Sequence, residues 1–318
     1  MSSERPDNGS ISIMALESGI KYESLDEAPD EPLLIEVIGI RPDDLAKLSQ
    51  RFEIDLEDLQ DVQDLDERPR LQIEDKFTML VFRVPVDIRK EDREYSTNPI
   101  GIFTNGKDII VIQNDQVPIR KARLRTRIRY STTVADIIYK WIEIVIHSFE
   151  TSLDLIEDTI NKTEEVIMKE IYPSQLEWFF QLSRDAIFME TSLKANMKVL
   201  RRLKRFHVVG RLILDVDRLE ELEVDLQQQV ELSAIYRELI ANAMNAYDSI
   251  VGHNLNRIFK ILTSISLLIS APTLVASFMG MNVIYVTQND PVAFLLIVLV
   301  CIIITIPLLI FLRKKDLL

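Results

Sequence analysis

The sequence predicts an α+β membrane protein with an N-terminal α/β domain, long stalk helices and two transmembrane helices near the C-terminal end. Short apolar runs between turn signals, a long stretch of helical periodicity and two uncharged apolar segments predict these parts in that order. The expected divisions are a flexible acidic N-terminal segment 1–31, an α/β domain 32–118, a helical stalk 119–257, transmembrane helices 258–280 and 292–312, an outer loop 281–291 and a basic tail 313–318.

Turn and cap signals delimit the elements of the α/β domain. Pro42-Asp43-Asp44 is a helix-start signal, and Asn105-Gly106 between two apolar runs is a strong hairpin signal. A run with few breakers, such as residues 77–84, indicates a buried strand. The expected elements are strands Leu33–Ile40, Phe77–Val84, Ile100–Phe103 and Ile109–Gln113 and helix Pro42–Phe52.

The net charge of −13 comes entirely from the N-terminal third of the chain. Residues 1–100 hold 25 acidic and 12 basic side chains, whereas the remaining residues hold 25 of each. Such a domain repels nucleic acid and attracts cations. The basic run Arg120–Arg129 has no aromatic residue before Tyr130, so a solvated helix start that pairs with the acidic domain is the favoured interpretation over nucleic-acid binding.

Helical periodicity dominates from Thr133 onward. Apolar residues at three- and four-residue steps predict a first amphipathic helix: Ile137, Ile138, Trp141, Ile142, Val145, Phe149, Leu153, Ile156 and Ile160. Tyr172-Pro173-Ser174 ends this helix and begins a second, which runs to about Phe206. A third is expected from about Leu212, with no proline before Pro272. Long antiparallel helices of this kind predict a stalk or bundle.

Two apolar segments close the chain, Ile261–Met279 and Val292–Leu312, and neither contains a charge. Each is close to the ~20 residues that span a bilayer. Basic residues flank the pair at Arg257, Lys260 and Arg313–Lys315, while the connecting loop has none, so both termini are expected in the cytoplasm. Met1–Ser10 has no apolar core, so no cleaved signal peptide is expected. The predicted location is the inner (plasma) membrane.

Hydroxyl side chains form a stripe on the first membrane segment. Five of its six polar residues follow steps of three, four, three and four, namely Thr263, Ser266, Ser270, Thr273 and Ser277; Ser264 does not. A single hydroxyl in a membrane helix usually bonds its own backbone or packs against a neighbour. A continuous stripe faces either a neighbouring helix or water. One helical hairpin cannot enclose a pore, but several copies could turn their stripes toward a shared axis and hold a hydrated cation.

No enzyme class is indicated by the sequence. A nucleotide-binding loop, a glycine-rich dinucleotide turn and a His-Glu-x-x-His helix are all absent, and no organic cofactor is expected. The single cysteine, Cys301, lies in an apolar segment and excludes an intrachain disulfide. His147, His207 and His253 are scattered without metal-ligand spacing.

Directly after the stripe stands Gly280-Met281-Asn282, preceded by Ala271-Pro272-Thr273-Leu274-Val275-Ala276 and followed at a distance by the basic tail. This pattern resembles the signature of the CorA magnesium-transporter family, and Glu67-Arg68-Pro69-Arg70 resembles a family stretch that ends in Arg-Pro-Lys. Differences remain: Met279 replaces the usual tyrosine, Ser277 replaces a glycine, and residues 283–289 lack the usual acidic stretch.

The resemblance implies a homopentameric funnel in a lipid bilayer, with the first transmembrane helix lining the pore. It assigns Gly280, Met281 and Asn282 to the outer ion entrance, Thr273 and Ser277 to the upper pore, Ser266 and Ser270 to its middle, Phe259 and Leu262 to a hydrophobic gate, and Asn256 to the inner mouth. It also assigns Asp61 and Glu221 to a regulatory metal site between neighbouring copies.

The predicted function is passive, gated uptake of Mg²⁺, with Co²⁺ and Ni²⁺ as further candidates, driven by the membrane potential and regulated by cytosolic metal. A proton-coupled zinc transporter of the same superfamily is one alternative. A membrane-anchored helical interaction protein is another, although it does not explain the hydroxyl stripe.

Overall fold

The computed structural model describes residues 10–39, 42–85, 97–114, 133–167, 173–209, 212–281 and 291–315 together with residue 317. It divides into two compact units, Met1–Ala243 and Met244–Leu318. The boundary between them falls inside one long helix, α6 (Val216–Met279). The basic run 120–129 and most of the loop 281–291 lie outside the described residues.

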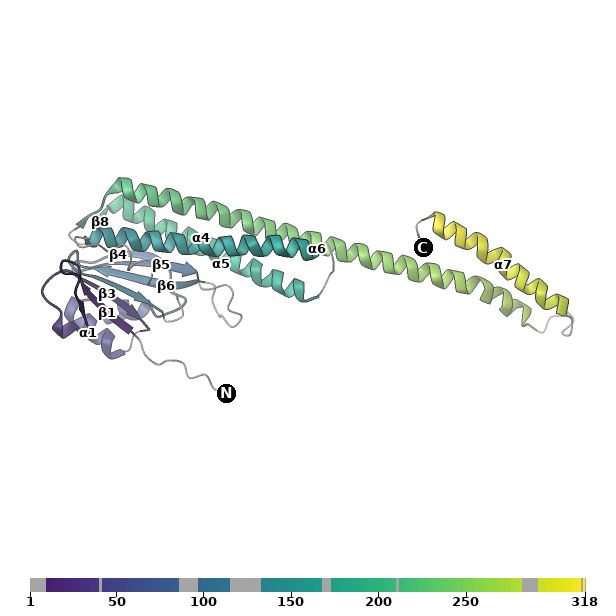
Figure 1. The fold of residues 1–318 in the computed structure, drawn as a ribbon, viewed down its shortest axis with the longest axis horizontal. Helices are drawn as coiled ribbons and strands as arrows, with labels where there is room; N and C mark the ends of the chain where they lie inside the picture. The colour runs from purple at the N-terminus through teal and green to yellow at the C-terminus, as the bar shows by residue number, and fades with distance from the viewer. Residues whose placement is uncertain are drawn as a thin grey trace. The chain divides into compact units, whose positions relative to one another are not determined.

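A mixed seven-stranded sheet forms the centre of the first unit (Figure 1), with the strand order β2-β1-β3-β7-β6-β5-β4. Only β3 and β7 pair in parallel; the other neighbours are antiparallel. The strands are β1 (Ser10–Ala15), β2 (Lys21–Tyr22), β3 (Leu33–Ile38), β4 (Arg70–Ile73), β5 (Thr78–Pro85), β6 (Thr97–Thr104) and β7 (Ile109–Gln113).

The strands and turn predicted for this domain are confirmed at β3, β5, β6 and β7. The Asn105-Gly106 turn joins β6 to β7 because Asn105 Oδ1 accepts hydrogen bonds from the backbone N–H groups of Lys107 (2.9 Å) and Asp108 (2.7 Å). Gly106 has a φ of 89°, which a residue with a side chain rarely adopts. Helix α1 (Pro42–Phe52) has the predicted bounds.

The prediction of a flexible segment over residues 1–31 is wrong from residue 10 onward. Strand β1 pairs with β3 along its whole length, with Ile13 opposite Ile35, and Ile13 and Ala15 are buried. A 3-10 helix, η1 (Leu25–Glu27), follows β2. The alternation of serine with isoleucine in residues 10–13 is the period-two pattern of a strand with one buried face, and the acidic residues around it obscured that signal.

Helices cover both faces of the sheet (Figure 1). On one face, α1 and α2 (Leu56–Asp61) bury an apolar core against β1, β3 and β7. On the other, α4 (Val134–Ile167) and α5 (Pro173–Phe206) pack on β5. Asn196 of α5 binds the backbone of Arg83 twice, accepting from its N–H at 2.9 Å and donating to its carbonyl at 2.8 Å. The α/β domain 32–118 and most of the stalk 119–257 are therefore layers of one compact unit, not separate domains.

The N-terminal part of α6, residues 216–243, completes the helical layer of the first unit. Tyr236 donates to Glu157 of α4 at 2.7 Å, and Arg237 donates to Glu190 of α5 at 2.6 Å. Burial, together with the neighbouring Glu157 carboxylate, raises the pKa of Tyr236 to about 12, so its hydroxyl stays a donor at physiological pH. The third helix begins at Val216 instead of Leu212, because Leu212–Ile213 (β9) pairs with Val208–Val209 (β8) in a small hairpin.

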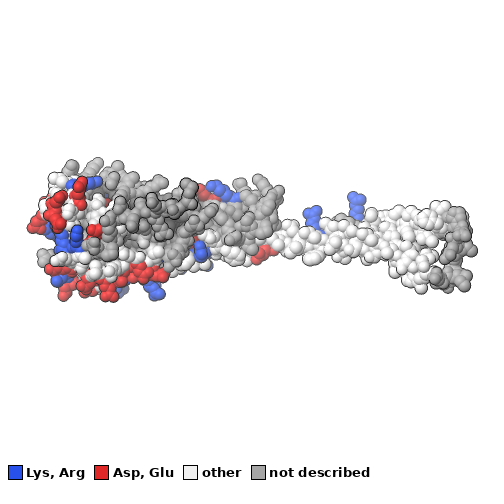
Figure 2. All heavy atoms as spheres, turned by 90° about the horizontal axis from the view of Figure 1, so that it is seen from below, with Lys and Arg blue, Asp and Glu red and all other residues white. Residues whose placement is uncertain are grey.

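The second unit contains the C-terminal part of α6, residues 244–279, and helix α7 (Pro291–Lys314). Both are long and apolar enough to cross a membrane, which agrees with the segments 261–279 and 292–312. In Figure 2 few side chains of this unit are coloured as acidic or basic residues. Helix α6 continues through Pro272 and Gly252 without interruption, so both residues lie inside one helix.

Gly101 of β6 sets how closely α2 packs on the sheet. A Cβ atom at this position would lie 2.5 Å from Cγ2 of Val62, which is fully buried at the end of α2. We expect Gly101→Ala to lower the free energy of unfolding by about 1–3 kcal/mol, the usual cost of overpacking a core. Denaturant unfolding of the detergent-solubilised protein measures this change.

Gly252→Ala is the matched control, because within the described part of the chain no atom other than its chain neighbours and the backbone of its own helix turn lies within 4 Å of a Cβ placed there. Gly252 is in the interior of α6, where alanine has the higher helix propensity, so stability is expected to stay the same or rise by up to ~1 kcal/mol. Equal stabilities for the two variants would contradict the close packing of Val62 on Gly101.

Candidate functional site

The hydroxyl stripe of α6 is exposed along its whole length in the single chain. We define the stripe as Thr263, Ser266, Ser270, Thr273 and Ser277, all of which are exposed. The face of α6 that contacts α7 is a different one: Ser264 is buried, and Leu268, Ala271, Pro272 and Val275 are partly buried. At 3.6 residues per turn, the mean directions of the two faces differ by about 165°. Helix α7 therefore leaves the stripe uncovered.

Two stripe hydroxyls bond their own helix. Ser270 Oγ donates to the carbonyl of Ser266, and Thr273 Oγ1 donates to the carbonyl of Ile269, both at 2.7 Å. These two hydroxyls therefore use their protons as most single hydroxyls in membrane helices do, in a hydrogen bond to the backbone of their own helix. Each oxygen keeps acceptor lone pairs on the exposed side, and these can bind the water around a cation.

Ser264, the one hydroxyl outside the stripe, bonds the C-terminal end of the chain. Its Oγ donates to the carbonyl of Leu317 at 2.8 Å, and the N–H of Leu317 in turn donates to the carbonyl of the buried Leu312 at 3.1 Å. Higher on the same side of α6, the Cys301 thiol of α7 lies 3.9 Å from the carbonyl of Pro272. These contacts fix which side of α6 packs against α7. The sequence separated Ser264 from the stripe but contained no signal for its partner.

The remaining pore candidates lie on α6 or directly after its end at Met279. Phe259 and Leu262, the predicted gate, are 62% and 58% exposed, and Asn256 is exposed as well. Gly280 continues the hydrogen bonding of the helix, since its N–H donates to Ala276 at 3.0 Å. Met281 is exposed, whereas Asn282 lies outside the described residues. Side chains of this kind can form a ring only when several copies come together.

The two carboxylates of the predicted regulatory site lie on different elements, Asp61 at the end of α2 and Glu221 on α6. Glu221 is exposed, whereas Glu223 is bound by Arg201 and Lys204 of α5 at 2.8 and 2.5 Å. Among the described residues, no group of three or more His, Cys, Asp or Glu side chains could hold a metal. Both candidate carboxylates are accessible to a second copy, as a site between copies requires.

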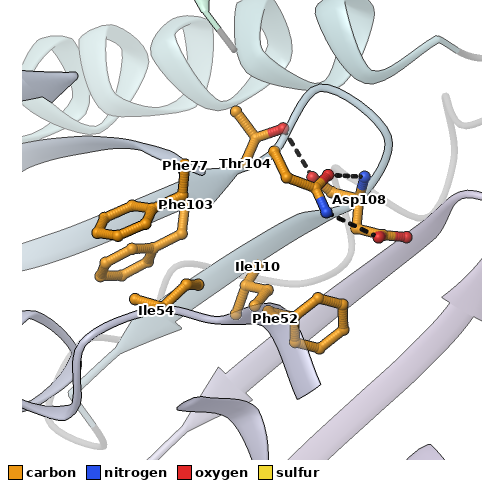
Figure 3. Close-up of a pocket in the computed structure, with 8 residues that line it drawn as sticks. Phe52, Ile54, Phe77, Phe103, Thr104, Asp108 and Ile110 are labelled. Carbon is orange, nitrogen blue, oxygen red and sulfur yellow. Dashed lines mark hydrogen bonds between the residues drawn. The ribbon is translucent and has the colours of Figure 1, made fainter. Parts of the chain in front are cut away.

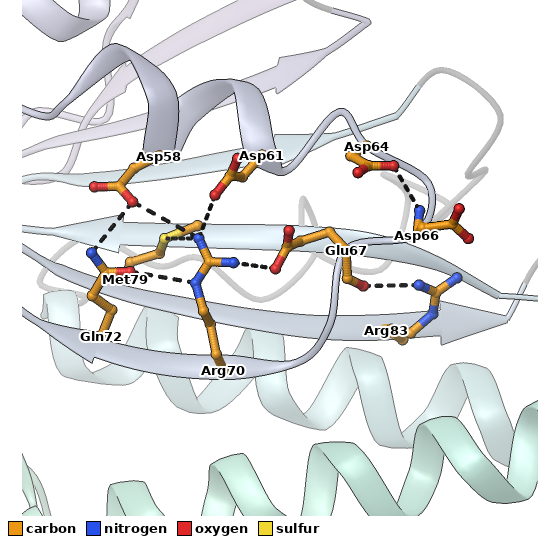
Figure 4. A network of polar contacts seen from close by, with 9 residues as sticks. All are labelled: Asp58, Asp61, Asp64, Asp66, Glu67, Arg70, Gln72, Met79 and Arg83. Atoms are coloured by element: carbon orange, nitrogen blue, oxygen red, sulfur yellow. Dashed lines mark hydrogen bonds and ion pairs between the residues drawn. The ribbon is translucent and has the colours of Figure 1, made fainter.

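Sequence reasoning missed the partner of Asp61. Figure 4 shows Arg70, the first residue of β4, pointing toward the end of α2, where its Nη2 lies 2.7 Å from Asp61 Oδ2. The same guanidinium contacts Glu67 and lies 3.8 Å from Asp58. An arginine within an acidic stretch was the available signal, but the pairing depends on how β4 runs beneath α2.

A hollow beside the apolar core of this unit has no ligand-binding character (Figure 3). The space in it that can hold the centre of a water molecule is about 10 Å³, roughly the room for one water, which is far below the volume of ordinary ligand pockets. Its lining is mostly apolar, with side chains such as Phe52 and Phe103. At its polar edge, Thr104 donates to the Asp108 carbonyl at 2.6 Å and Asn105 donates to the Asp108 carboxylate at 3.2 Å. The β6–β7 turn therefore already uses these groups.

Comparison with known proteins gives one consistent family. The model of the family described as "CorA-like Mg2+ transporter protein" matches residues 35–314. The cobalt/magnesium transport protein CorA of Methanocaldococcus jannaschii is 26% identical over 304 residues, covering 92% of this chain and 95% of that protein. The protein of the same description from Thermotoga maritima is 22% identical over 276 residues, covering 81% and 75%.

A solved structure agrees with the family match across nearly the whole chain. The complete CorA magnesium transporter of M. jannaschii superposes with a TM-score of 0.81 at 24% identity, covering 96% of this chain and 97% of that one. The fold class predicted from the sequence, an N-terminal α/β part followed by long helices and two C-terminal apolar helices, is therefore confirmed. Because the family model spans most of the sequence, this chain belongs to the CorA-like Mg²⁺ transporter family.

Proposed function

We propose that this chain forms a homo-oligomer, a pentamer by family resemblance, in which the α6 helices surround a water-filled path for hydrated divalent cations, with Mg²⁺ as the principal substrate. The observation that carries the proposal is the exposed hydroxyl stripe, which lies nearly opposite the face that α7 covers. Neutral hydroxyl groups suit a cation that keeps its water, because Mg²⁺ gives up its hydration shell reluctantly.

The membrane potential is a sufficient driving force for entry. A divalent cation that crosses 100 mV gains about 4.6 kcal/mol, twice the ~2.3 kcal/mol of a unit charge. The basic residues beside both membrane segments favour the inner membrane with both termini in the cytoplasm. The acidic first unit then faces the cytosol, the compartment in which the free metal level has to be sensed.

Gating is assigned to the inner half of the path. Phe259 and Leu262 project from α6 as exposed apolar side chains, and a ring of them would close the path by excluding water. Asp61 and Glu221 are assigned to a metal site between neighbouring copies, where their two carboxylates would bind one divalent cation. Loss of the metal would then loosen the contact between copies and favour the open state.

Fluorescence uptake into proteoliposomes tests the proposal. Mg²⁺, Co²⁺, Ni²⁺ and Zn²⁺ are each supplied outside, with and without an inward proton gradient. We expect Mg²⁺ uptake that responds to membrane potential and needs no proton gradient; the relatives described as cobalt/magnesium transport proteins support testing Co²⁺ beside it. Zn²⁺ uptake that requires protons would favour the zinc transporter, and the absence of uptake for every ion would favour a membrane anchor.

A further inference from the structure

Arg70 is surrounded by three carboxylates from one short stretch of the chain (Figure 4). Its guanidinium lies 2.7 Å from Asp61, 3.8 Å from Asp58 and in contact with Glu67. Its side chain is 30% exposed, so the group is shielded from water more than an ordinary surface pair such as Lys76–Glu53, where both side chains are 64% exposed. A partly buried, charge-assisted contact of this kind is stronger than an ion pair between two solvated side chains.

The three carboxylates differ in how firmly they are held. Glu67 and Asp58 are only 15% and 13% exposed, whereas Asp61 is 38% exposed. The backbone carbonyl of Glu67 accepts from Arg83 at 2.8 Å, and Asp58 accepts from Gln72 at 3.3 Å. Burial raises the pKa of Asp58, and the hydrogen bond from Gln72 and the charge of Arg70 oppose that rise. Asp61 is therefore the most exposed of the three carboxylates and the one that a metal ion from solvent reaches most easily.

We propose that Arg70 acts as a tethered cation that competes with a divalent metal for the carboxylate of Asp61 and so sets the metal concentration at which the regulatory site fills. This inference rests on the proposed function, in which Asp61 and Glu221 hold a metal between copies. Without metal, the guanidinium neutralises Asp61. With metal, Asp61 turns to the solvent side and Arg70 keeps Glu67 and Asp58 as partners, so the exchange leaves no buried charge unpaired.

The charge balance makes this competition effective. Three carboxylates and one guanidinium leave the group with two net negative charges, so it still attracts a cation. The positive charge of Arg70 nevertheless opposes a second cation bound to the same carboxylate, because like charges at this separation repel. An arginine with a merely structural role would change the stability of the fold without changing the response to metal.

The test is the thermal unfolding of the full chain in detergent during a titration with MgCl₂. Arg70→Gln is expected to lower the Mg²⁺ concentration for half-maximal stabilisation by at least about tenfold, the effect of removing a nearby like charge. Arg68→Gln is the matched control, because Arg68 is an exposed residue two positions before Arg70 and its replacement removes the same charge. It is expected to shift this concentration by less than about twofold. Equal or weaker Mg²⁺ binding by Arg70→Gln would overturn the inference.

Two further variants cover the other outcomes. Arg70→Lys keeps the charge but loses the guanidinium fork, so the Mg²⁺ concentration for half-maximal stabilisation is expected to fall by about threefold. If this concentration were unchanged, the result would count against competition even if Arg70→Gln does not fold. Asp61→Asn combined with Arg70→Gln is expected to abolish the gain in Mg²⁺ affinity, and a persisting gain would place the metal elsewhere and overturn the inference. If the wild-type chain takes up Mg²⁺ but Arg70→Gln does not change the Mg²⁺ concentration for half-maximal stabilisation, the inference is rejected and the proposed function stands. If Arg70→Gln does change this concentration but the wild-type chain takes up no Mg²⁺, only the channel function is rejected.

Discussion

Asn282→Ala is expected to abolish Mg²⁺ uptake while leaving thermal unfolding and the oligomeric state unchanged. Asn282 follows the end of α6 at Met279 and Gly280, where a ring of side-chain amides would receive the hydrated ion. Each amide lost removes a hydrogen bond of about 1 kcal/mol. In a pentamer these add to about 5 kcal/mol, which corresponds to a roughly 4,000-fold loss in ion binding.

Asn289→Ala is the matched control for this variant, because it removes the same amide from the same loop, away from the Gly280-Met281-Asn282 tripeptide. Uptake by both variants is measured in proteoliposomes of equal protein content, and unfolding is followed in detergent. Mg²⁺ uptake by Asn282→Ala at the rate of Asn289→Ala would remove the assigned role of Asn282 at the ion entrance.

The double variant Asp61→Ala with Glu221→Ala is expected to release the channel from inhibition by cytosolic Mg²⁺. Both carboxylates are accessible in the single chain, and carboxylate oxygens are ligands that Mg²⁺ prefers. Without them, the proposed site would no longer let a metal ion bridge neighbouring copies. The Mg²⁺ concentration for half-maximal inhibition is expected to rise by at least about tenfold, since a divalent site loses two charged ligands.

Asp64→Ala with Glu220→Ala controls for the change in net charge, because each residue lies close in sequence to one member of the predicted pair. Inhibition is measured as the rate of uptake against the Mg²⁺ concentration on the cytosolic side. The same inhibition curve for both double variants would reject Asp61 and Glu221 as the sensor and would leave the pore assignment unaffected.

Local signals predicted the elements that depend on neighbouring residues. Pro42-Asp43-Asp44 gave the start of α1, and Asn105-Gly106 gave the β6–β7 hairpin, because both turn chemistries act within a few residues. The two membrane segments followed from length and the absence of charge. Strand β1 was missed although residues 10–13 alternate in the pattern of a strand, because the strand is short, lies among acidic residues, and is held in place by pairing with β3.

Non-local contacts were the part of the candidate site that the sequence did not reveal. Arg70 and Asp61 are nine residues apart and meet only because β4 passes beside the end of α2. Ser264 and Leu317 are 53 residues apart and meet because α7 folds back along α6. Helical spacing could separate Ser264 from the stripe, but only the packing of α7 defines the covered face. The assembly that would close a pore requires further copies of the chain.

Accessibility of single cysteines to a charged, membrane-impermeant thiol reagent tests the central claim most directly. In a Cys301→Ala background, Ser270→Cys places a thiol in the stripe, and Leu268→Cys places one on the face toward α7 at nearly the same depth. At low cytosolic Mg²⁺, we predict that the thiol at position 270 reacts at least about tenfold faster and that its reaction blocks uptake. Equal rates at the two positions, or uptake that continues after complete modification of position 270, would contradict a water-filled path lined by α6.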